Sequence, residues 1–337
     1  MSRAPLRLHR PPATLGEAVS ALAAAGPGAR VLAGGTTLYD LMKLDIETPH
    51  SVVDVRALRE LAGIDTAGAG ELSFGAGALM ADVAEDPVLL RDYPALAESL
   101  AKAASQQLRN MATVGGNLLQ RTRCGYFRGG PPFACNKREP GSGCAAIGGL
   151  DRGHALLGGS EACVATYPGD WAVALIAFDA VVDVAGPGGT RTIPLAELHV
   201  EPGDTPAREH TLAAGEIITR IRVPVTPVGR GSTYHKVRDR ESYAFALASA
   251  AAAVRFGGDG SVAECRIAVG GVATRPWRCP DAERELTGAA LDERSARRAG
   301  EAAFAGARPG AHNGFRVELG IRTVAEALRI AGERAVR

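Results

Sequence analysis

Residues 30–43, RVLAGGTTLYDLMK, lead a β-rich run into a helix through a turn at Gly34 and Gly35. Backbone N–H groups at such a turn and helix start can point at an anion. Thr36 and Thr37 add hydroxyl donors beside them. Taken alone, a strand, glycine turn and helix junction is more often a tight turn than a phosphate site. The stretch therefore predicts local structure and leaves its function open.

A second turn of the same kind occurs in residues 109–120, RNMATVGGNLLQ. Two glycine turns in one domain could hold the two ends of a dinucleotide. A third glycine-rich stretch, residues 186–189, follows VVDV and resembles a dinucleotide fingerprint only superficially, because TRTIPL after it indicates a returning strand instead of a helix. We therefore predict a hairpin turn at residues 186–189.

Composition limits the classes of partner. The 337 residues are 46% hydrophobic and 22% charged, and 38 basic residues nearly balance 37 acidic ones. No broad electrostatic field favours nucleic acid or an anionic membrane. No apolar run reaches the length of a membrane span, and the N-terminal residues lack the pattern of an export signal. Six cysteines are too few for a disulfide-built scaffold in a chain of this length.

Local patterns predict the elements in order. Thr14 and Glu17 indicate a helix start, and Gly26 with Pro27 its end. Further expected elements are a strand at 30–36, a helix at 38–44, a strand at 51–58, a strand then a helix in 71–86, and one long helix in 93–110. Residues 162–199 suggest a strand, a helix and a hairpin. Prolines and glycines mark a domain boundary at 223–232, followed by antiparallel strands and then helices from Asp281.

The motifs AGGTTLYDLMKL (33–44) and LRNMATVGGNL (108–118) resemble the two flavin-binding motifs of the FAD subunits of the xanthine dehydrogenase and carbon monoxide dehydrogenase superfamily. The resemblance covers essentially the whole chain. QRTRC (120–124), CNKREPGSGCAA (135–146), SEAC (160–163) and KVRDRESYAFA (236–246) are most similar to the flavin subunit of bacterial three-subunit aldehyde oxidoreductases.

The resemblance implies an α+β fold with a two-part FAD-binding domain of the PCMH type over residues 1–226. Its small lobe would span about 1–56 and its larger lobe about 57–226, with a cluster-binding insertion at about 121–163. A smaller C-terminal domain of antiparallel sheet and helices would follow at 227–337.

The resemblance also implies FAD contacts at individual residues. The first motif would wrap the FAD pyrophosphate, and Lys236 would lie near the isoalloxazine. From the residues alone, Asp170 could simply cap a helix and Lys236 could be a solvated strand residue. The implied FAD-binding residues are Val31, Leu32, Ala33, Gly34, Gly35, Thr36, Thr37, Leu38, Thr113, Gly116, Asn117, Asp170 and Lys236.

Three cysteines lie in RCGYFRGGPPFACNKREPGSGC, residues 123–144, and Cys163 follows. Their spacing matches neither common ferredoxin patterns nor a structural zinc knuckle, so spacing alone leaves a cluster, a zinc ion and free thiols open. The loop lacks an apolar core of its own, which favours a cofactor, and backbone N–H groups of Gly141 and Gly143 could donate to cluster sulfurs.

The resemblance implies a [4Fe-4S] cluster in this loop, held by Cys124, Cys135, Cys144 and Cys163. Cys265 and Cys279 match no ligand and are interpreted as structural thiols. Cys124 follows the second flavin motif closely and Cys163 precedes Asp170 closely, so the insertion would be tethered at both ends to the FAD site.

The function implied by the resemblance is electron transfer within a larger molybdenum hydroxylase. A molybdopterin-binding large subunit and a small subunit with two [2Fe-2S] clusters would be partners, and FAD would reduce a terminal acceptor. The alternatives are a free-standing FAD oxidoreductase and a non-catalytic zinc or iron-sulfur module. The complex would lie in the cytoplasm, or in the periplasm by co-export with a partner.

Overall fold

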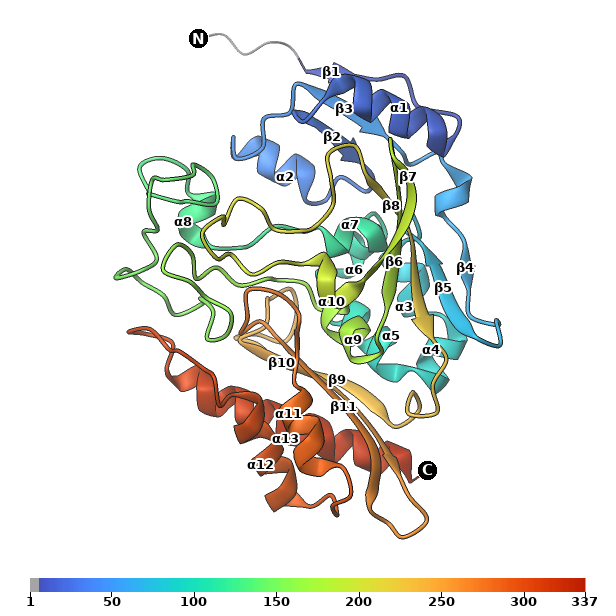
Figure 1. Cartoon of the computed structure of the whole chain (residues 1–337), viewed down its shortest axis with the longest axis vertical. Coiled ribbons are helices and arrows are strands. Elements are labelled where there is room, and N and C mark those ends of the chain that lie inside the picture. Colours follow the sequence, from blue (N-terminus) through green and yellow to red (C-terminus); the bar gives the residue numbers. More distant parts are fainter. Residues whose placement is uncertain (1–5, 337) are drawn as a thin grey trace.

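The computed structural model describes residues 6–336, and three β-sheets organise them. Figure 1 shows a small sheet near the N-terminus, a larger sheet in the middle and a third sheet beside the C-terminal helices. Helices accompany each sheet, which confirms the predicted α+β fold class. Within residues 6–336 no helix is both long and apolar enough to cross a bilayer.

The N-terminal lobe is a parallel sheet of order β1-β3-β2 with two helices. As predicted, the first helix begins where the Thr14 hydroxyl accepts a hydrogen bond from the Glu17 N–H, at 3.2 Å, and ends at Gly26, whose φ is 78°. The Gly34-Gly35 turn connects β2 to the second helix. The elements are β1 (Arg7–Leu8), α1 (Leu15–Ala25), β2 (Ala29–Leu32), α2 (Leu38–Lys43) and β3 (Ser51–Asp54).

Short helices follow, and one of our predictions is wrong here. Residues 93–110 form two helices instead of one, because the chain turns at Ala104, whose φ is 49°, and Ser105 then caps a new helix by accepting from the Leu108 N–H at 3.3 Å. The elements are the 3₁₀ turn η1 (Arg59–Leu61), α3 (Met80–Ala84), α4 (Pro87–Asp92), α5 (Pro94–Ala101), α6 (Gln106–Arg109) and α7 (Val114–Leu118).

The central sheet is antiparallel, with the order β4-β5-β8-β6-β7. Gly186 pairs with Gly189 at the tip of the β6–β7 hairpin, which confirms the predicted turn. The predicted strand near Cys163 is absent from the described structure, where irregular chain leads into α9. The elements are β4 (Ile64–Asp65), β5 (Glu71–Gly75), α8 (Gly125–Arg128), α9 (Trp171–Ala177), β6 (Val181–Gly186), β7 (Gly189–Pro194), α10 (Leu195–Leu198) and β8 (Ile217–Pro224).

The third sheet has the order β12-β11-β10-β9 and is antiparallel, as predicted. Both faces of β10 are buried. Ala251 and Ala253 join the core around α9, while Ala250 and Ala252 join the core around α13. Small side chains let helices approach both faces, which fixes this sheet to the rest of the molecule. The elements are β9 (Ser232–Val237), β10 (Ala248–Phe256), β11 (Val262–Gly270), β12 (Trp277–Arg278), α11 (Pro280–Leu286), α12 (Glu293–Ala303) and α13 (Phe315–Ala335).

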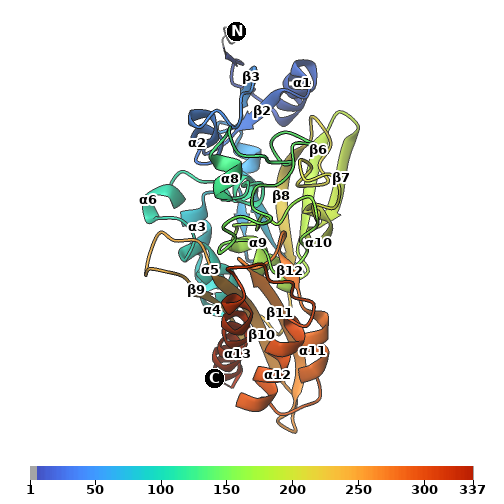
Figure 2. The ribbon, with the colours of Figure 1, turned by 90° about the vertical axis from the view of Figure 1, so that its left-hand side faces the viewer.

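The insertion after α7 has little regular structure beyond α8. Figure 1 shows it projecting beside the central sheet, and the turned view places it facing the viewer, between α2 and the C-terminal helices (Figure 2). Arg138 stabilises this loop by donating to the carbonyls of Tyr126 and Phe127, at 2.9 and 2.8 Å. Arg138 thus holds two parts of the insertion together through its backbone.

Candidate cofactor site

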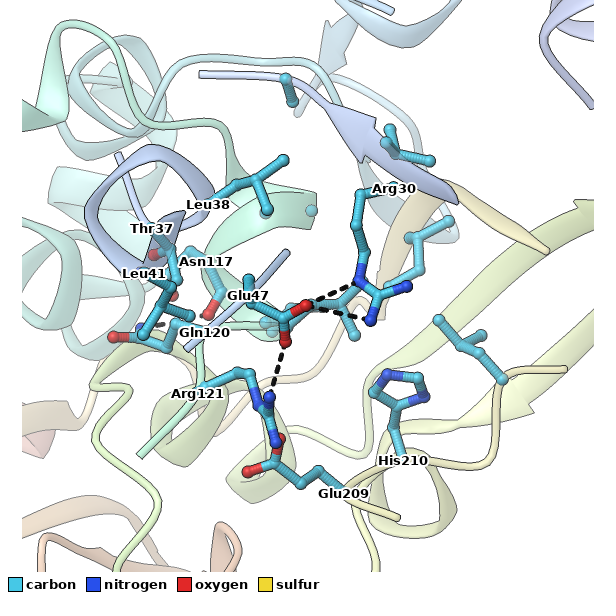
Figure 3. Close-up of a pocket in the computed structure, with 18 of the residues that line it drawn as sticks. Arg30, Thr37, Leu38, Leu41, Glu47, Asn117, Gln120, Arg121, Glu209 and His210 are labelled. Carbon is cyan, nitrogen blue, oxygen red and sulfur yellow. Dashed lines mark hydrogen bonds and ion pairs between the residues drawn. The ribbon is translucent and has the colours of Figure 1, made fainter. Parts of the chain in front are cut away.

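A cleft of about 610 Å³ lies where the N-terminal lobe meets the central sheet. Both glycine turns line it, together with residues 207–218 that lead into β8. Figure 3 shows Thr37 and Leu38 of the first motif near Asn117 of the second. Two turns that are far apart in the sequence thus contribute to one wall.

The first turn lies against the second motif. A Cβ added to Gly34 would overlap the carbonyl oxygen of Met111, so only glycine allows this approach. Gly35 adopts a φ of 73°, a conformation that L side chains rarely adopt. The backbone N–H groups of Gly34, Gly35, Thr36 and Thr37 donate no hydrogen bond within residues 6–336. These donors are available to a ligand in the cleft.

The second motif forms the start of α7. The Thr113 hydroxyl caps this helix by accepting from the Gly116 N–H at 3.3 Å, and Gly115 packs against Ala76 so closely that a Cβ would overlap it. The Asn117 amide donates to the Met80 sulfur at 3.5 Å, but its buried Oδ1 has no partner within residues 6–336. An unpartnered buried acceptor beside the cleft is suited to a ligand's hydrogen-bond donor.

Ion pairs form the charged side of the cleft, as Figure 3 shows. Glu47 accepts from Arg30 at 3.0 Å and from Arg121 at 2.6 Å, and Arg121 also pairs with Glu209. Lys137 of the insertion reaches Glu209 at 3.1 Å. Burial raises the pKa of Glu209, but Arg121 and Lys137 outweigh it and hold that pKa below its usual range. This network joins the N-terminal lobe, the insertion and the segment that leads into β8.

Two histidines lie beside this network and line the cleft, the buried His199 and the half-buried His210. His199 and His210 pair through their backbones, and the His199 Nε2 lies 2.8 Å from the Leu118 carbonyl oxygen. Burial lowers the pKa of both, that of His199 to about 4. The Nδ1 atom of each has no partner within residues 6–336. Burial therefore favours the neutral form of both rings at the cleft wall.

A second, smaller cavity lies in the insertion, and we call it the thiol cavity. Four cysteine side chains border it: Cys124, Cys135, Cys144 and Cys163. The space that remains open inside it is about 10 Å³. Burial raises the pKa of the Cys124 thiol, and that of Cys163 to about 11. Within residues 6–336, no group of three or more His, Cys, Asp or Glu side chains is arranged to hold a metal ion.

The thiol cavity shares a wall with the large cleft, because Lys137, Cys163 and Ala165 line both. His154 also borders the thiol cavity, although its place in the sequence gave no indication of this. Cys265 and Cys279 are buried in the core around α13, apart from the other four. The structure therefore separates the cysteines into the two groups that the sequence predicted.

Comparison with known proteins identifies the family. Residues 6–226 match the family model of the FAD binding domain in molybdopterin dehydrogenase, and residues 232–331 match that of the CO dehydrogenase flavoprotein C-terminal domain. The aldehyde oxidoreductase FAD-binding subunit PaoB of Escherichia coli K12 is 47% identical over 310 residues, which are 92% of this chain and 93% of that protein. The chain belongs to the FAD-binding subunits of the xanthine dehydrogenase and carbon monoxide dehydrogenase family.

Other relatives match most of the length of this FAD-binding subunit. The carbon monoxide dehydrogenase medium chain of Hydrogenophaga pseudoflava is 28% identical over 89% of this chain and 87% of that protein. A solved carbon monoxide dehydrogenase from the same organism superimposes with a TM-score of 0.76 at 27% identity, over 99% of both chains. Quinoline 2-oxidoreductase from Pseudomonas putida 86 gives 0.76 at 25% identity over the whole of both chains. These homologues are oxidoreductases, and this chain is an oxidoreductase subunit that binds FAD.

The residues of the cleft fit FAD. Free backbone N–H groups at a glycine turn suit a pyrophosphate, and the close approach at Gly34 leaves room for one. Of the residues implied by the resemblance, Val31, Ala33, Gly34, Gly35, Thr36, Thr37, Leu38, Thr113, Gly116 and Asn117 line the cleft of this FAD-binding subunit. Leu32, Asp170 and Lys236 lie outside its lining.

Asp170 and Lys236 lie together in the structure. The Lys236 Nζ is 2.8 Å from the Asp170 Oδ2, and the Tyr234 hydroxyl donates to Oδ1 at 2.6 Å. The two charged side chains are only 1% and 6% exposed. Asp170 precedes α9 but makes no capping hydrogen bond, and Lys236 is not solvated, so neither of the simple structural alternatives holds.

The backbone N–H groups of Gly141 and Gly143 have a different partner from the one expected. Both donate to the Asn136 Oδ1, at 3.1 and 2.8 Å, and are therefore not free for cluster sulfurs. Each glycine has a positive φ, which the turn requires. Their role is to close the loop around Asn136, and the expectation of N–H donation to sulfur from these two residues is wrong for this structure.

Proposed function

We propose that this FAD-binding subunit transfers electrons within a molybdopterin-dependent aldehyde oxidoreductase. It would receive electrons from the [2Fe-2S] clusters of a small partner subunit, while a molybdopterin-binding large subunit oxidises the aldehyde. FAD, when bound, can accept electrons singly and deliver them in pairs to a terminal acceptor. The 47% identity to a subunit described as belonging to an aldehyde oxidoreductase supports this assignment over the more distant dehydrogenases.

The chain's own residues would hold the cofactor in the large cleft. The free N–H groups from Gly34 to Thr37 would bind the pyrophosphate, with Thr113, Gly116 and Asn117 on the opposite turn. Arg121, fixed between Glu47 and Glu209, would keep the insertion against the cleft. The action of Asp170 and Lys236 at the isoalloxazine end stays a prediction, because their buried ion pair lies outside the lining of the cleft.

We also propose that Cys124, Cys135, Cys144 and Cys163 hold a [4Fe-4S] cluster. The observation that carries this part is that all four thiols border one cavity whose wall, at Lys137 and Cys163, is also the wall of the large cleft. Four thiolates are the usual ligand set of such clusters, and ligand binding would deprotonate the buried thiols. A cluster here would lie beside the flavin and exchange single electrons with it.

Metal analysis of anaerobically purified protein tests the cluster. We expect about four iron atoms and matching sulfide for each FAD. Cys135→Ser should lower the iron content and leave most of the FAD, whereas Cys265→Ser, in the other cysteine group, should leave both unchanged. Stoichiometric zinc without iron or sulfide would refute the cluster and leave the flavin assignment intact.

Assembly with partners tests the electron-transfer role. When the chain is expressed with its genomic neighbours, it should co-purify with two further subunits, one of which contains molybdenum. An aldehyde should then bleach the flavin absorbance of the complex under anaerobic conditions, and should leave the flavin of the isolated chain oxidised. Reduction of the isolated subunit by the aldehyde itself would indicate a free-standing FAD oxidoreductase instead.

A further inference from the structure

His154 borders the thiol cavity beside the four cysteines. Its Nε2 lies 3.2 Å from the Cys124 sulfur, and the residue is only 7% exposed. Its other ring nitrogen, Nδ1, is buried without a partner in residues 6–336. The imidazole therefore makes its one polar contact with a sulfur atom.

The chemistry of that contact fixes the direction of the hydrogen bond once a cluster is bound. A coordinating cysteine is a thiolate, which can accept a hydrogen bond but has no proton to donate. The ring must then carry its proton on Nε2. In the neutral imidazole this leaves Nδ1 as an acceptor, and that atom has no partner within the described chain.

We propose that His154 donates a hydrogen bond from Nε2 to the Cys124 sulfur and that this bond raises the reduction potential of the cluster. This inference rests on the proposed [4Fe-4S] site. A donor at a ligand sulfur stabilises the more negative, reduced state of a cluster more than the oxidised state. His154 is thus a positioning residue that acts through Cys124, and the four cysteines complete the ligand set without it.

Contacts from the C-terminal domain hold His154 in place. The Arg316 Nη1 donates to the His154 carbonyl oxygen at 2.7 Å, and the Asn313 amide donates to the same oxygen at 3.2 Å. Arg316 is 1% exposed, and its guanidinium also donates to the carbonyls of Leu247 and Gly271. No carboxylate pairs with Arg316 within residues 6–336, so this buried cation is held by backbone carbonyls from the insertion and from the C-terminal domain.

Contacts within the insertion also hold the His154 ring in one orientation. The His154 ring lies 6.0 Å from that of Tyr126, whose hydroxyl accepts from the Leu150 N–H at 2.7 Å. The His154 N–H itself donates to the Asp151 carbonyl at 2.8 Å. Both the backbone and one face of the ring are therefore constrained, which is what a hydrogen bond of constant length to sulfur needs.

The test compares three forms of the FAD-loaded, anaerobically purified protein: wild type, His154→Phe and His154→Gln. Phenylalanine keeps the ring volume but has no donor, and glutamine keeps an N–H donor. The measurements are iron and FAD content, the midpoint potential of the cluster by redox titration, and exchangeable-proton couplings in the electron paramagnetic resonance of the reduced cluster.

We expect all three forms to keep their iron and FAD. His154→Phe should have a more negative midpoint potential and lack one exchangeable-proton coupling that wild type shows, and the potential of His154→Gln should lie between those of the other two.

An unchanged potential in His154→Phe would overturn the proposal. Loss of iron with retained FAD in both variants would overturn it too, because His154 would then be a ligand. If His154→Phe fails to fold, absence of the coupling in wild type alone overturns it. Wild-type protein without iron would instead refute the cluster assignment itself.

Discussion

Lys236 and Asp170 form an ion pair of 2.8 Å that is almost completely shielded from solvent and joins β9 of the C-terminal domain to the start of α9. The Lys236 ammonium also donates to the Lys102 carbonyl at 3.0 Å, so α5 takes part as well. Burial raises the pKa of Asp170, and the lysine acts against that shift. Lys236 therefore links β9 to the start of α9 and to the C-terminal end of α5.

Replacing one side chain of this ion pair should lower the free energy of unfolding far more than replacing both. Lys236→Met leaves the Asp170 carboxylate buried with only the Tyr234 hydroxyl, and we expect a loss of about 3–5 kcal/mol in the free energy of unfolding. The double variant Lys236→Met with Asp170→Asn should lose less than the single one. Urea unfolding followed by circular dichroism measures both.

The exposed pair of Arg329 and Glu333 on α13 is the matched control, since Arg329 is 55% exposed. Arg329→Met should change the free energy of unfolding by less than about 1 kcal/mol. If Lys236→Met costs no more than this control, the buried pair does not couple the domains as described.

Gly34 gives a second prediction, on cofactor binding. In Gly34→Ala the new methyl group would overlap the Met111 carbonyl, and the two motifs would have to separate. Overpacking of this kind costs about 1–3 kcal/mol, which would weaken FAD binding about 5- to 150-fold if the cost falls on the bound form. Titration of the apoprotein with FAD gives the dissociation constant.

Gly63 is a suitable control for that substitution, because a Cβ there would meet no atom within 4 Å and its φ is not positive. Gly63→Ala should bind FAD as wild type does. Equal affinities of the Gly34→Ala and wild-type proteins would show that the first turn does not need its close approach to Met111 in order to bind the cofactor.

His199 predicts a pH dependence of stability. Its pKa falls from 6.5 to about 4 on folding because the ring is buried. Between these pH values the unfolded chain binds more protons, so the free energy of unfolding should fall as the pH drops from about 6.5 to about 4. The full effect is about 3 kcal/mol. His199→Gln cannot take up the proton and should lose less stability over this range.

Urea unfolding between pH 7 and pH 4 checks this, and it compares the slope of stability against pH in the two proteins. The exposed His50 provides the control, and His50→Gln should keep the wild-type slope. Identical slopes for His199→Gln and wild type would mean that His199 is accessible to protons in the folded protein.

Local signals in the sequence predicted most elements correctly. Contacts between residues that are far apart in the sequence were missed. Thr14 and Gly26 bound α1 because capping depends only on neighbouring residues. The ion-pair network of Arg30, Glu47, Arg121 and Glu209 was not predicted, because no local pattern marks partners separated by 74 and 88 positions. Strand β8 was missed for the same reason, since its pairing with β5 and β6 is set by the sheet.

The sequence predicted individual residues of the site but not the contacts between them. Asp170 and Lys236 were both expected at the flavin, yet their mutual ion pair spans 66 positions and has no signature in the sequence. His154 has no motif or local pattern that links it to the cysteines, and only the fold brings it to Cys124. Hydrogen bonds of Gly141 and Gly143 to Asn136 could have been suspected, since asparagine commonly bonds backbone groups in turns.

The break between α5 and α6 supplies the last prediction. Residues 93–110 have helical spacing throughout, but Ala104 adopts a φ of 49°, which costs an alanine about 1–2 kcal/mol relative to its usual conformation. Glycine has no such cost, although it loses more entropy on folding. We expect Ala104→Gly to stabilise the protein by about 0.5–1 kcal/mol.

The continuous helix α13 provides the control, where Ala325→Gly should instead destabilise the protein by about 1 kcal/mol. Opposite signs in urea unfolding would confirm the break, and equal losses would mean that residues 93–110 remain helical through Ala104 in solution.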